Sequence, residues 1–203
     1  MTSLYDAGTQ SGGRPPAPGR LALVQAFVNS FFELGEHHGA DHFATAAGLA
    51  GWLGARGLEP GAVTAGERER AVAVREGLRA LLREHNGEPR DAGAVAALRA
   101  AADGLPVSVR VDAEGATEPV PAGRGVPAAL GLVLAVVHEA RADSTWDRLK
   151  ACPGSHCGWA FYDNSPGRTS TWCSMRVCGG REKARAYRRR VRQGRAAGRS
   201  LTS

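Results

Sequence analysis

The segment CPGSHCGWAFYDNSPGRTSTWCSMRVC, residues 152–178, contains every cysteine of the 203-residue chain. These cysteines form two C-x4-C pairs separated by fifteen residues: Cys152, Cys157, Cys173 and Cys178. Zinc prefers four soft ligands in a tetrahedron, and two short loops that each offer two thiolates supply them. Gly158 and Gly179 follow the second cysteine of each pair, where glycine lets the backbone curl around a metal. The segment therefore predicts a site for one zinc ion.

Four cysteines also have other uses, namely two disulfides, or an iron or iron–sulfur site with thiolate ligands. Disulfides need an oxidising compartment, and the first 20 residues contain no apolar block typical of a secretory signal. His156 could replace its neighbour Cys157 as a ligand, although four thiolates already complete a tetrahedron. Because four cysteine ligands leave no position for water, we interpret the expected zinc as structural rather than catalytic.

The positive charge of the chain is concentrated after the last cysteine. Residues 181–203 contain nine Arg or Lys and one Glu, a balance of +8. Residues 1–180 contain seventeen basic and nineteen acidic residues, a balance of −2. The spacing over 181–192 predicts a helix with Ala184, Tyr187 and Val191 on one side and arginines on the other. This uneven distribution of charge indicates what kind of partner the segment binds, and it does not indicate how the segment folds.

The basic residues in and after the cysteine segment are candidates for contact with DNA. Guanidinium groups bind phosphate oxygens in pairs, and the release of counterions drives the association. The candidates are Arg168, Arg176, Arg181, Lys183, Arg185, Arg188, Arg189 and Arg192. A solvated basic tail and a protein-binding surface are the alternatives for the same residues.

Before the cysteine segment, apolar periodicity predicts a mainly α-helical protein with one small β-hairpin. Thr64 with Glu67 forms a capping box, and Asp91 can cap a further helix. Valines alternate with polar residues over 107–111, and with residues 117–120 they form the expected hairpin. The helices are expected at about residues 21–35, 45–55, 64–86, 91–101 and 127–141.

This pattern divides the chain into four segments. Residues before Leu21 lack periodicity and are rich in Gly and Pro, which is typical of disorder. The expected segments are a disordered N-terminus at 1–20, a helical domain at 21–144, a zinc module with its basic helix at 145–193, and a disordered tail at 194–203.

Histidines and aromatic residues offer further candidates. His37, His38 and His42 lie close together around Asp41, and either form a second metal site or belong to a surface loop. We expect Trp52 in the core. Beside the cysteines, Trp159, Trp172 and Phe161 are expected to cover the metal from water, and Asp163 to accept hydrogen bonds rather than act as a base.

No catalytic motif stands out in the sequence. It contains no phosphate loop, no G-x-S-x-G elbow and no dinucleotide fingerprint, so we do not expect an enzyme. The longest apolar run, Ala128 to Val137, covers about half of the roughly 20 residues that a bilayer needs. We therefore expect a cytoplasmic protein without a membrane partner.

Residues 152–190 resemble the CGNR zinc-finger family, which is found at the C-terminus of bacterial proteins. The resemblance is carried by Cys152, Cys157, Phe161, Asp163, Ser165, Trp172-Cys173-Ser174-Met175, Cys178-Gly179-Gly180-Arg181 and Lys183. In that family the finger follows a helical domain called ABATE, associated with stress-induced transcription regulation. Phe27-Val28-Asn29-Ser30 and Leu49 with Trp52-Leu53 are similar to that domain, so the resemblance covers about residues 20–192.

The resemblance implies a DNA-binding transcription regulator whose N-terminal domain senses a signal or dimerises. A homodimer and a small-molecule effector are then candidate partners besides DNA. The chain departs from the family at Gly180, where the family has Asn, and at Ser165-Pro166-Gly167. Ser170 and Thr171 also stand where the family commonly has basic residues, which weakens the inference that this loop contacts DNA. The alternative is an adaptor whose zinc module only binds other proteins.

Overall fold

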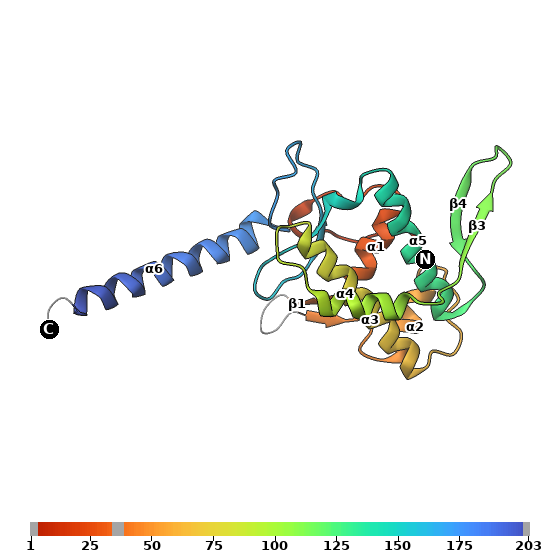
Figure 1. Cartoon of the computed structure of the whole chain (residues 1–203), viewed down its shortest axis with the longest axis horizontal. Helices are drawn as coiled ribbons and strands as arrows, with labels where there is room; N and C mark the ends of the chain where they lie inside the picture. Colours follow the sequence, from red (N-terminus) through yellow and green to blue (C-terminus); the bar gives the residue numbers. More distant parts are fainter. Residues whose placement is uncertain (1–3, 34–38, 201–203) are drawn as a thin grey trace.

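A computed structural model describes residues 4–33 and 39–200, with side chains described for residues 4–32 and 39–193. The described chain is mainly α-helical, as predicted (Figure 1). Its helices are α1 (Leu21–Val28), α2 (Ala46–Gly54), α3 (Ala65–Glu84), α4 (Ala92–Ala102), α5 (Gly125–Ala142) and α6 (Gly180–Ser200). Its strands are β1 (Phe31–Glu33), β2 (Gly39–Asp41), β3 (Val107–Val111), β4 (Thr117–Pro121), β5 (Leu149–Ala151) and β6 (Ala160–Tyr162).

The core lies between α1, α3 and α5, which pack against one another. Every residue of α1 is buried, and α3 contributes Leu78 and Leu82 to the same core. The predicted capping box begins α3. Thr64 Oγ1 accepts from the Glu67 amide at 3.2 Å, and Glu67 Oε2 accepts from the Thr64 amide at 2.9 Å. Asp91 caps α4 in the same way, since its Oδ1 accepts from the Ala94 amide at 2.9 Å.

The strands form three two-stranded antiparallel sheets, of which β3–β4 is the predicted hairpin. The pairs β1–β2 and β5–β6 were not predicted. The first helix was expected to include Phe31 and Phe32, but α1 ends at Val28 and both phenylalanines belong to β1. The reason is Asn29, whose side chain donates to the Ala160 carbonyl at 2.9 Å and accepts from the Ala160 amide at 2.7 Å. This contact with β6 takes the chain out of the helix.

The two expected disordered ends are ordered where the structure describes them. Gln10 is buried, and Arg14 donates to the carbonyls of Cys173 and Trp172 at 2.9 and 3.0 Å. The polar, Gly-rich N-terminus is therefore held against the cysteine segment by hydrogen bonds, and Ala17 joins the apolar core. At the other end the backbone of α6 is helical through Ser200.

Helix α5 is by length and composition apolar enough to cross a membrane, which the sequence analysis did not expect of any segment. In the structure 56% of its 18 residues are buried inside the protein. They include Leu130, Leu132, Val133 and Val136, which belong to the core. The apolar character of α5 is accounted for by its place in that core.

The outline of the molecule is a helical body with two projections (Figure 1). The hairpin β3–β4 extends from one end of the body, beside α5. Helix α6 extends from the opposite end, away from the other helices.

Candidate metal centre and basic helix

The four cysteine sulfurs lie together in one cluster, within 4.8 Å of one another. The Sγ atoms of Cys157 and Cys173 are 3.6 Å apart, as are those of Cys173 and Cys178. A tetrahedron with Zn–S bonds of about 2.3 Å has edges of about 3.8 Å, so the spacing fits four thiolates around one zinc ion. All four cysteines are free, and the distances far exceed an S–S bond of about 2.05 Å, which excludes the two disulfides.

The first cysteine pair lies on the loop between β5 and β6. The Cys157 amide donates to the Gly154 carbonyl at 2.9 Å, and the Gly158 amide donates to the Cys152 carbonyl at 3.2 Å. These bonds fold the loop so that both sulfurs point to one place. Gly158 has a φ of +63°, a left-handed conformation that glycine adopts without strain. The expected role of this glycine is confirmed.

Of the second pair, Cys178 lies on a π-helical turn, Met175–Gly179, that leads directly into α6, and Cys173 lies just before this turn. Ser174 begins the turn, because its Oγ accepts from the Val177 amide at 3.3 Å and its carbonyl accepts from the Cys178 amide at 2.9 Å. Gly179 lacks the left-handed backbone of Gly158. A Cβ there would lie 2.5 Å from the sulfur of the flexible, exposed Met175 side chain, which would have to move.

Aromatic side chains shield the sulfurs. Cys152, Cys173 and Cys178 are buried with Phe161 in a small cluster of their own, and Trp159 and Trp172 pack against it, as predicted. In this enclosed site the hydrogen bond with Cys157 lowers the pKa of Cys152, and the same contact raises the pKa of Cys157. One ionised cysteine thus makes it harder for its neighbour to lose a proton. A bound divalent cation offsets this repulsion, so all four thiols can then ionise.

Three residues far away in the sequence fasten this cysteine cluster to the body. Arg14 holds the Cys173 and Trp172 carbonyls, and Asn86, just after α3, donates to the carbonyls of Ala151 and Thr171 at 2.9 and 2.7 Å. From within α3, Arg79 donates to the carbonyl of Gly158, next to Cys157.

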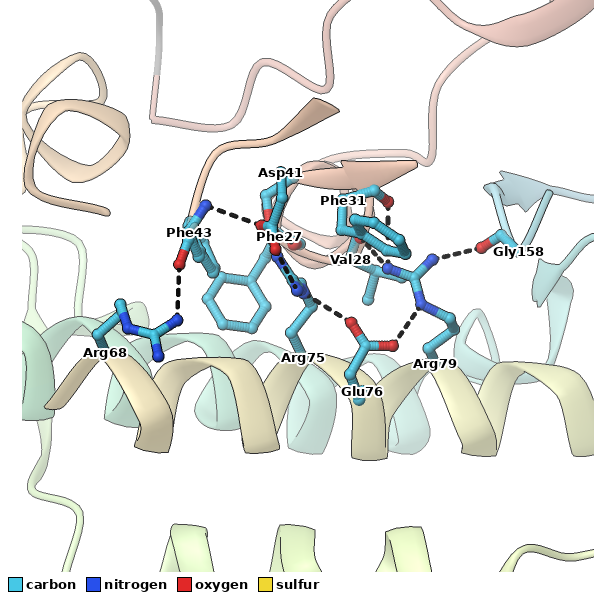
Figure 2. Close-up of polar contacts among 11 residues, drawn as sticks. Phe27, Val28, Phe31, Asp41, Phe43, Arg68, Arg75, Glu76, Arg79 and Gly158 are labelled. Atoms are coloured by element: carbon cyan, nitrogen blue, oxygen red, sulfur yellow. Dashed lines mark hydrogen bonds and ion pairs between the residues drawn. The ribbon is translucent and has the colours of Figure 1, made fainter. Parts of the chain in front are cut away.

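Figure 2 shows how Arg79 reaches the cysteine loop. Its guanidinium also donates to the carbonyls of Val28 at 2.8 Å and Phe31 at 3.1 Å, while Glu76 accepts from its Nε at 2.8 Å. Burial lowers the pKa of Arg79, and Glu76 opposes this shift. Sequence analysis missed Arg79, because an arginine on a helix is ordinarily placed on the solvent side.

Asp163 accepts hydrogen bonds, as expected, and is fully buried. Lys150 Nζ donates to its Oδ2 at 2.8 Å, the Ser165 amide to Oδ1 at 2.9 Å, and the Ser170 amide to Oδ2 at 3.0 Å. Burial alone would raise the pKa of Asp163, but the bonds from Lys150, Ser165 and Ser170 hold it well below its usual range. The pair anchors the loop that leads to the second cysteine pair.

The candidate DNA contacts lie on two parts of the site. Arg168, on the loop, and Arg176, on the π-helical turn, are both exposed. On α6 the exposed candidates are Arg181, Lys183, Arg188, Arg189 and Arg192. Arg185 is half-buried and pairs with Glu182 at 2.7 Å. The sequence analysis left out Arg190, which is exposed on the same helix.

The histidine cluster, given above as either a second metal site or a surface loop, is only partly described. His37 and His38 lie outside the described residues. Asp41 forms an ion pair with the buried Arg75, with 2.6 Å between Oδ1 and Nη1, as Figure 2 shows. Within the described part of the chain, the four cysteines form the one group able to hold a metal, and it does not include His42. Trp52 is buried against Phe27 in the core, as predicted.

Comparison with known protein families agrees with this geometry. Residues 148–191 match the CGNR zinc finger, and residues 19–148 match ABATE, described as "Putative stress-induced transcription regulator". The chain belongs to the ABATE family. No curated protein matches the chain. The zinc-finger match selects zinc over iron, so this ABATE protein has a site for one structural zinc ion, formed by its four cysteines.

The two family matches meet at Arg148, whose amide donates to the Thr145 carbonyl. Of the departures from the CGNR pattern in this ABATE protein, Gly180 is the first residue of α6. Pro166 and Gly167 are exposed at the tip of the loop anchored by Asp163. None of these positions touches the cysteine sulfurs, so the zinc site is intact despite them.

Proposed function

We propose that this ABATE protein is a DNA-binding transcription regulator in which α6 contacts the phosphate backbone. The observation that carries the proposal is the isolation of α6. Among the described elements, α6 packs mainly against the π-helical turn before it, and it extends alone from the body (Figure 1). Its 21 residues span about 31 Å at 1.5 Å per residue, which leaves a long basic surface open to a partner.

The zinc site supplies the rigidity that this arrangement needs. Cys178 is a ligand, and α6 begins two residues later at Gly180, so the metal and the helix share one piece of backbone. Glu182, in the first turn, accepts from the Ser155 hydroxyl at 3.3 Å on the other cysteine loop. A helix held at its base in this way can be presented to a groove in a defined direction. In this proposal the protein acts in the cytoplasm, and its N-terminal domain senses a stress signal or dimerises.

Salt dependence of DNA binding tests the proposal. If the basic face meets about five phosphates, the logarithm of affinity falls with the logarithm of salt with a slope of about −4.5. Affinity then falls about 500-fold between 50 and 200 mM salt, by the counterion-release relation. A regulator should also prefer one sequence over bulk DNA by a factor of at least about 10³. Fluorescence anisotropy with labelled duplexes measures both quantities.

Charge reversal identifies the surface. Arg189→Glu with Arg192→Glu should reduce the affinity by more than tenfold and flatten the salt slope, because both side chains are exposed on α6. The matched control, Arg90→Glu just before α4 with Arg99→Glu on α4, makes the same change in net charge and should bind DNA like the parent. If the α6 variant binds as well as the control, the basic helix is only a solvated surface.

A protein-binding adaptor is the second candidate, and one observation favours it. Tyr187 and Val191 are 64% and 36% exposed on the same side of α6, which is an apolar stripe on a basic helix. Such a stripe suits the groove of an acidic protein partner. Absence of DNA binding at low salt, with zinc bound, would make the adaptor the leading function.

A further inference from the structure

Exposed large apolar side chains gather in two places among the described residues. One place is the zinc module with α6, where Met175, Tyr187 and Val191 are exposed. The other is β3, where Val107, Val109 and Val111 are 54%, 59% and 62% exposed. The β3 valines have no part in the DNA binding by α6 proposed above. They lie on the hairpin that projects from the far end of the molecule (Figure 1).

The hydrogen-bond pattern of the hairpin shows which backbone groups are unpaired. The Asp112 amide donates to the Ala116 carbonyl at 2.9 Å beside the turn. Hydrogen-bonded pairs alternate along an antiparallel ladder, so the next are Arg110 with Glu118 and Ser108 with Val120. The amides and carbonyls of Val107, Val109 and Val111 therefore point away from β4, toward the free edge of β3.

The two edges of this hairpin differ in their ability to pair with another strand. Pro119 and Pro121 lie opposite Val109 and Val107, so their nitrogens point to the outer edge of β4. Proline has no amide hydrogen, and that edge is therefore closed to further strands. The edge of β3 has no proline, and in the described part of the chain no strand pairs with it. The edge of β3 is open and apolar, and the edge of β4 is closed by prolines. If a further strand joins this hairpin, it therefore pairs with β3.

We propose that β3 pairs with β3 of a second copy of this chain, antiparallel and centred on Val109. In this register Val109 faces Val109 of the second copy, and Val107 faces Val111. Each of these is a hydrogen-bonded pair, so all three outward residues exchange amide–carbonyl bonds with the second copy. Directly opposed valines also pack well across strands. The two hairpins then form one four-stranded sheet with a two-fold axis, the symmetry expected of a homodimer.

Charge supports the same register. With Val109 at the centre, Arg110 faces Ser108 of the second copy, and no like charges are directly opposed. A slip that centres the pairing on Arg110 would set two arginines face to face, which is unfavourable. The charge of Arg110 is already balanced within its own hairpin by Glu118. The strand is thus self-complementary in one register.

This pairing rests on the part of the proposed function in which the N-terminal domain dimerises, and it gives that dimer a surface at the opposite end of the molecule from α6. In Figure 1 the hairpin and α6 lie at opposite ends of the body. A dimer joined at the hairpins would therefore carry its two basic helices at its outer ends. The dimer is tested without DNA, so its failure and the failure of DNA binding can be told apart.

Sedimentation equilibrium on the zinc-bound full chain is the first test. The parent should approach twice its 21.2 kDa mass as its concentration rises. Val109→Pro removes an outward amide that β4 does not use, so it should sediment as a folded monomer. Val109→Thr keeps the amide and the branched side chain, and should dimerise like the parent. A parent that stays monomeric, or a proline variant that still dimerises, would overturn the proposal.

A cross-link tests the register even if the proline variant is unstable. Residues in a hydrogen-bonded antiparallel pair have Cα atoms about 5.5 Å apart, within the range of a disulfide. Val109→Cys should therefore form a covalent dimer on mild oxidation. Ala113→Cys, at the exposed turn, is the matched control and should not cross-link. Equal cross-linking of the two variants, or none at Val109→Cys, would contradict the centred register.

Discussion

Asp163 and Lys150 form an ion pair that is almost completely removed from solvent, with side chains 0% and 7% exposed. Lys150 also donates to the carbonyls of Arg168 and Ser170, so one ammonium group connects β5 to the whole loop that follows β6. That loop leads to Cys173. A charged pair outside the group of four cysteine ligands thus helps to determine where two zinc ligands lie.

Asp163→Asn should lower the free energy of unfolding by about 3–5 kcal/mol near neutral pH, because it leaves the buried ammonium without its counter-charge. The folded-state pKa of Asp163 is depressed. The stability that this carboxylate contributes is therefore present above about pH 4, its ordinary pKa, and is lost as the pH falls through the lower folded-state value. The gap between parent and variant should narrow over that range in urea denaturation.

Asp103→Asn is the control for this experiment, since Asp103 is exposed at the end of α4. It should change the stability by less than about 0.5 kcal/mol at any pH tested. A pH-independent gap would show that Asp163 acts through packing rather than through its charge.

At the scale of elements, α3 connects the two parts of the chain. Val74 and Leu78, in the middle of α3, pack in the core. Further along the helix, Arg79 donates to the Gly158 carbonyl on the cysteine loop. Just after the helix ends, Asn86 donates to the Ala151 carbonyl on β5. The 20 residues of α3 begin at a strong capping box. A rigid helix with contacts at both ends can transmit a displacement from the core to the zinc site.

Arg79→Lys should destabilise the protein by roughly 2–6 kcal/mol, because lysine keeps the charge but leaves about two of three buried carbonyls without a donor. Zinc should also leave faster, since the Gly158 carbonyl beside Cys157 loses its donor. Urea denaturation and competition with a coloured chelator measure the two effects. Arg83→Lys, one turn later and exposed, should change neither. Unchanged zinc release in Arg79→Lys would mean that α3 does not support the cysteine loop.

The helices and the hairpin predicted correctly from the sequence are those whose signals lie in neighbouring residues. The capping residues Thr64 and Asp91 act on amides three positions away, and the valines of β3 alternate with polar neighbours. The missed strands β1, β2, β5 and β6 have three residues each, too few for a recognisable period. Phe31 and Phe32 fall at helical spacing from Val28, and long-range contacts such as that of Asn29 with β6 end the helix before them.

The same distinction holds for the candidate site. Its ligands and its aromatic shield are apparent from the cysteine spacing and the neighbouring Trp and Phe. Its supports are not, because Arg14 lies 159 positions from Cys173 and Arg79 lies 79 positions from Gly158. A polar N-terminus gives no sign that one of its arginines will meet particular carbonyls. Those contacts are properties of the folded chain.

At the scale of the whole molecule, the apolar core crosses the boundary expected at residue 144. Trp146, Leu149 and Tyr162, from the zinc-finger side, belong to the same core as Phe27 and Leu82. The division into an independent helical domain and a zinc module stays a prediction. A shared core couples the two parts energetically.

Cys173→Ser should therefore lose its zinc and also lower the unfolding temperature of the whole chain. Zinc at about a thousandfold over its Kd contributes about 4 kcal/mol. Its loss should lower the midpoint by roughly 10 °C in a protein of this size. Calorimetry with elemental analysis tests this, with Ser155→Ala as the control on the same module. Two transitions, one of them at the parent temperature, would show instead that the helical domain folds independently.

The isolation of α6 has a consequence for how such a protein can change over generations. Beyond its first turn the helix contributes nothing to the core, so substitutions at its exposed positions from about Arg188 onward leave stability almost untouched. Selection therefore acts on mutations there only through their effect on what the helix binds. New partners can therefore be explored on α6 at little risk to folding, whereas Arg79, Asp163 and the four cysteines admit almost no variation.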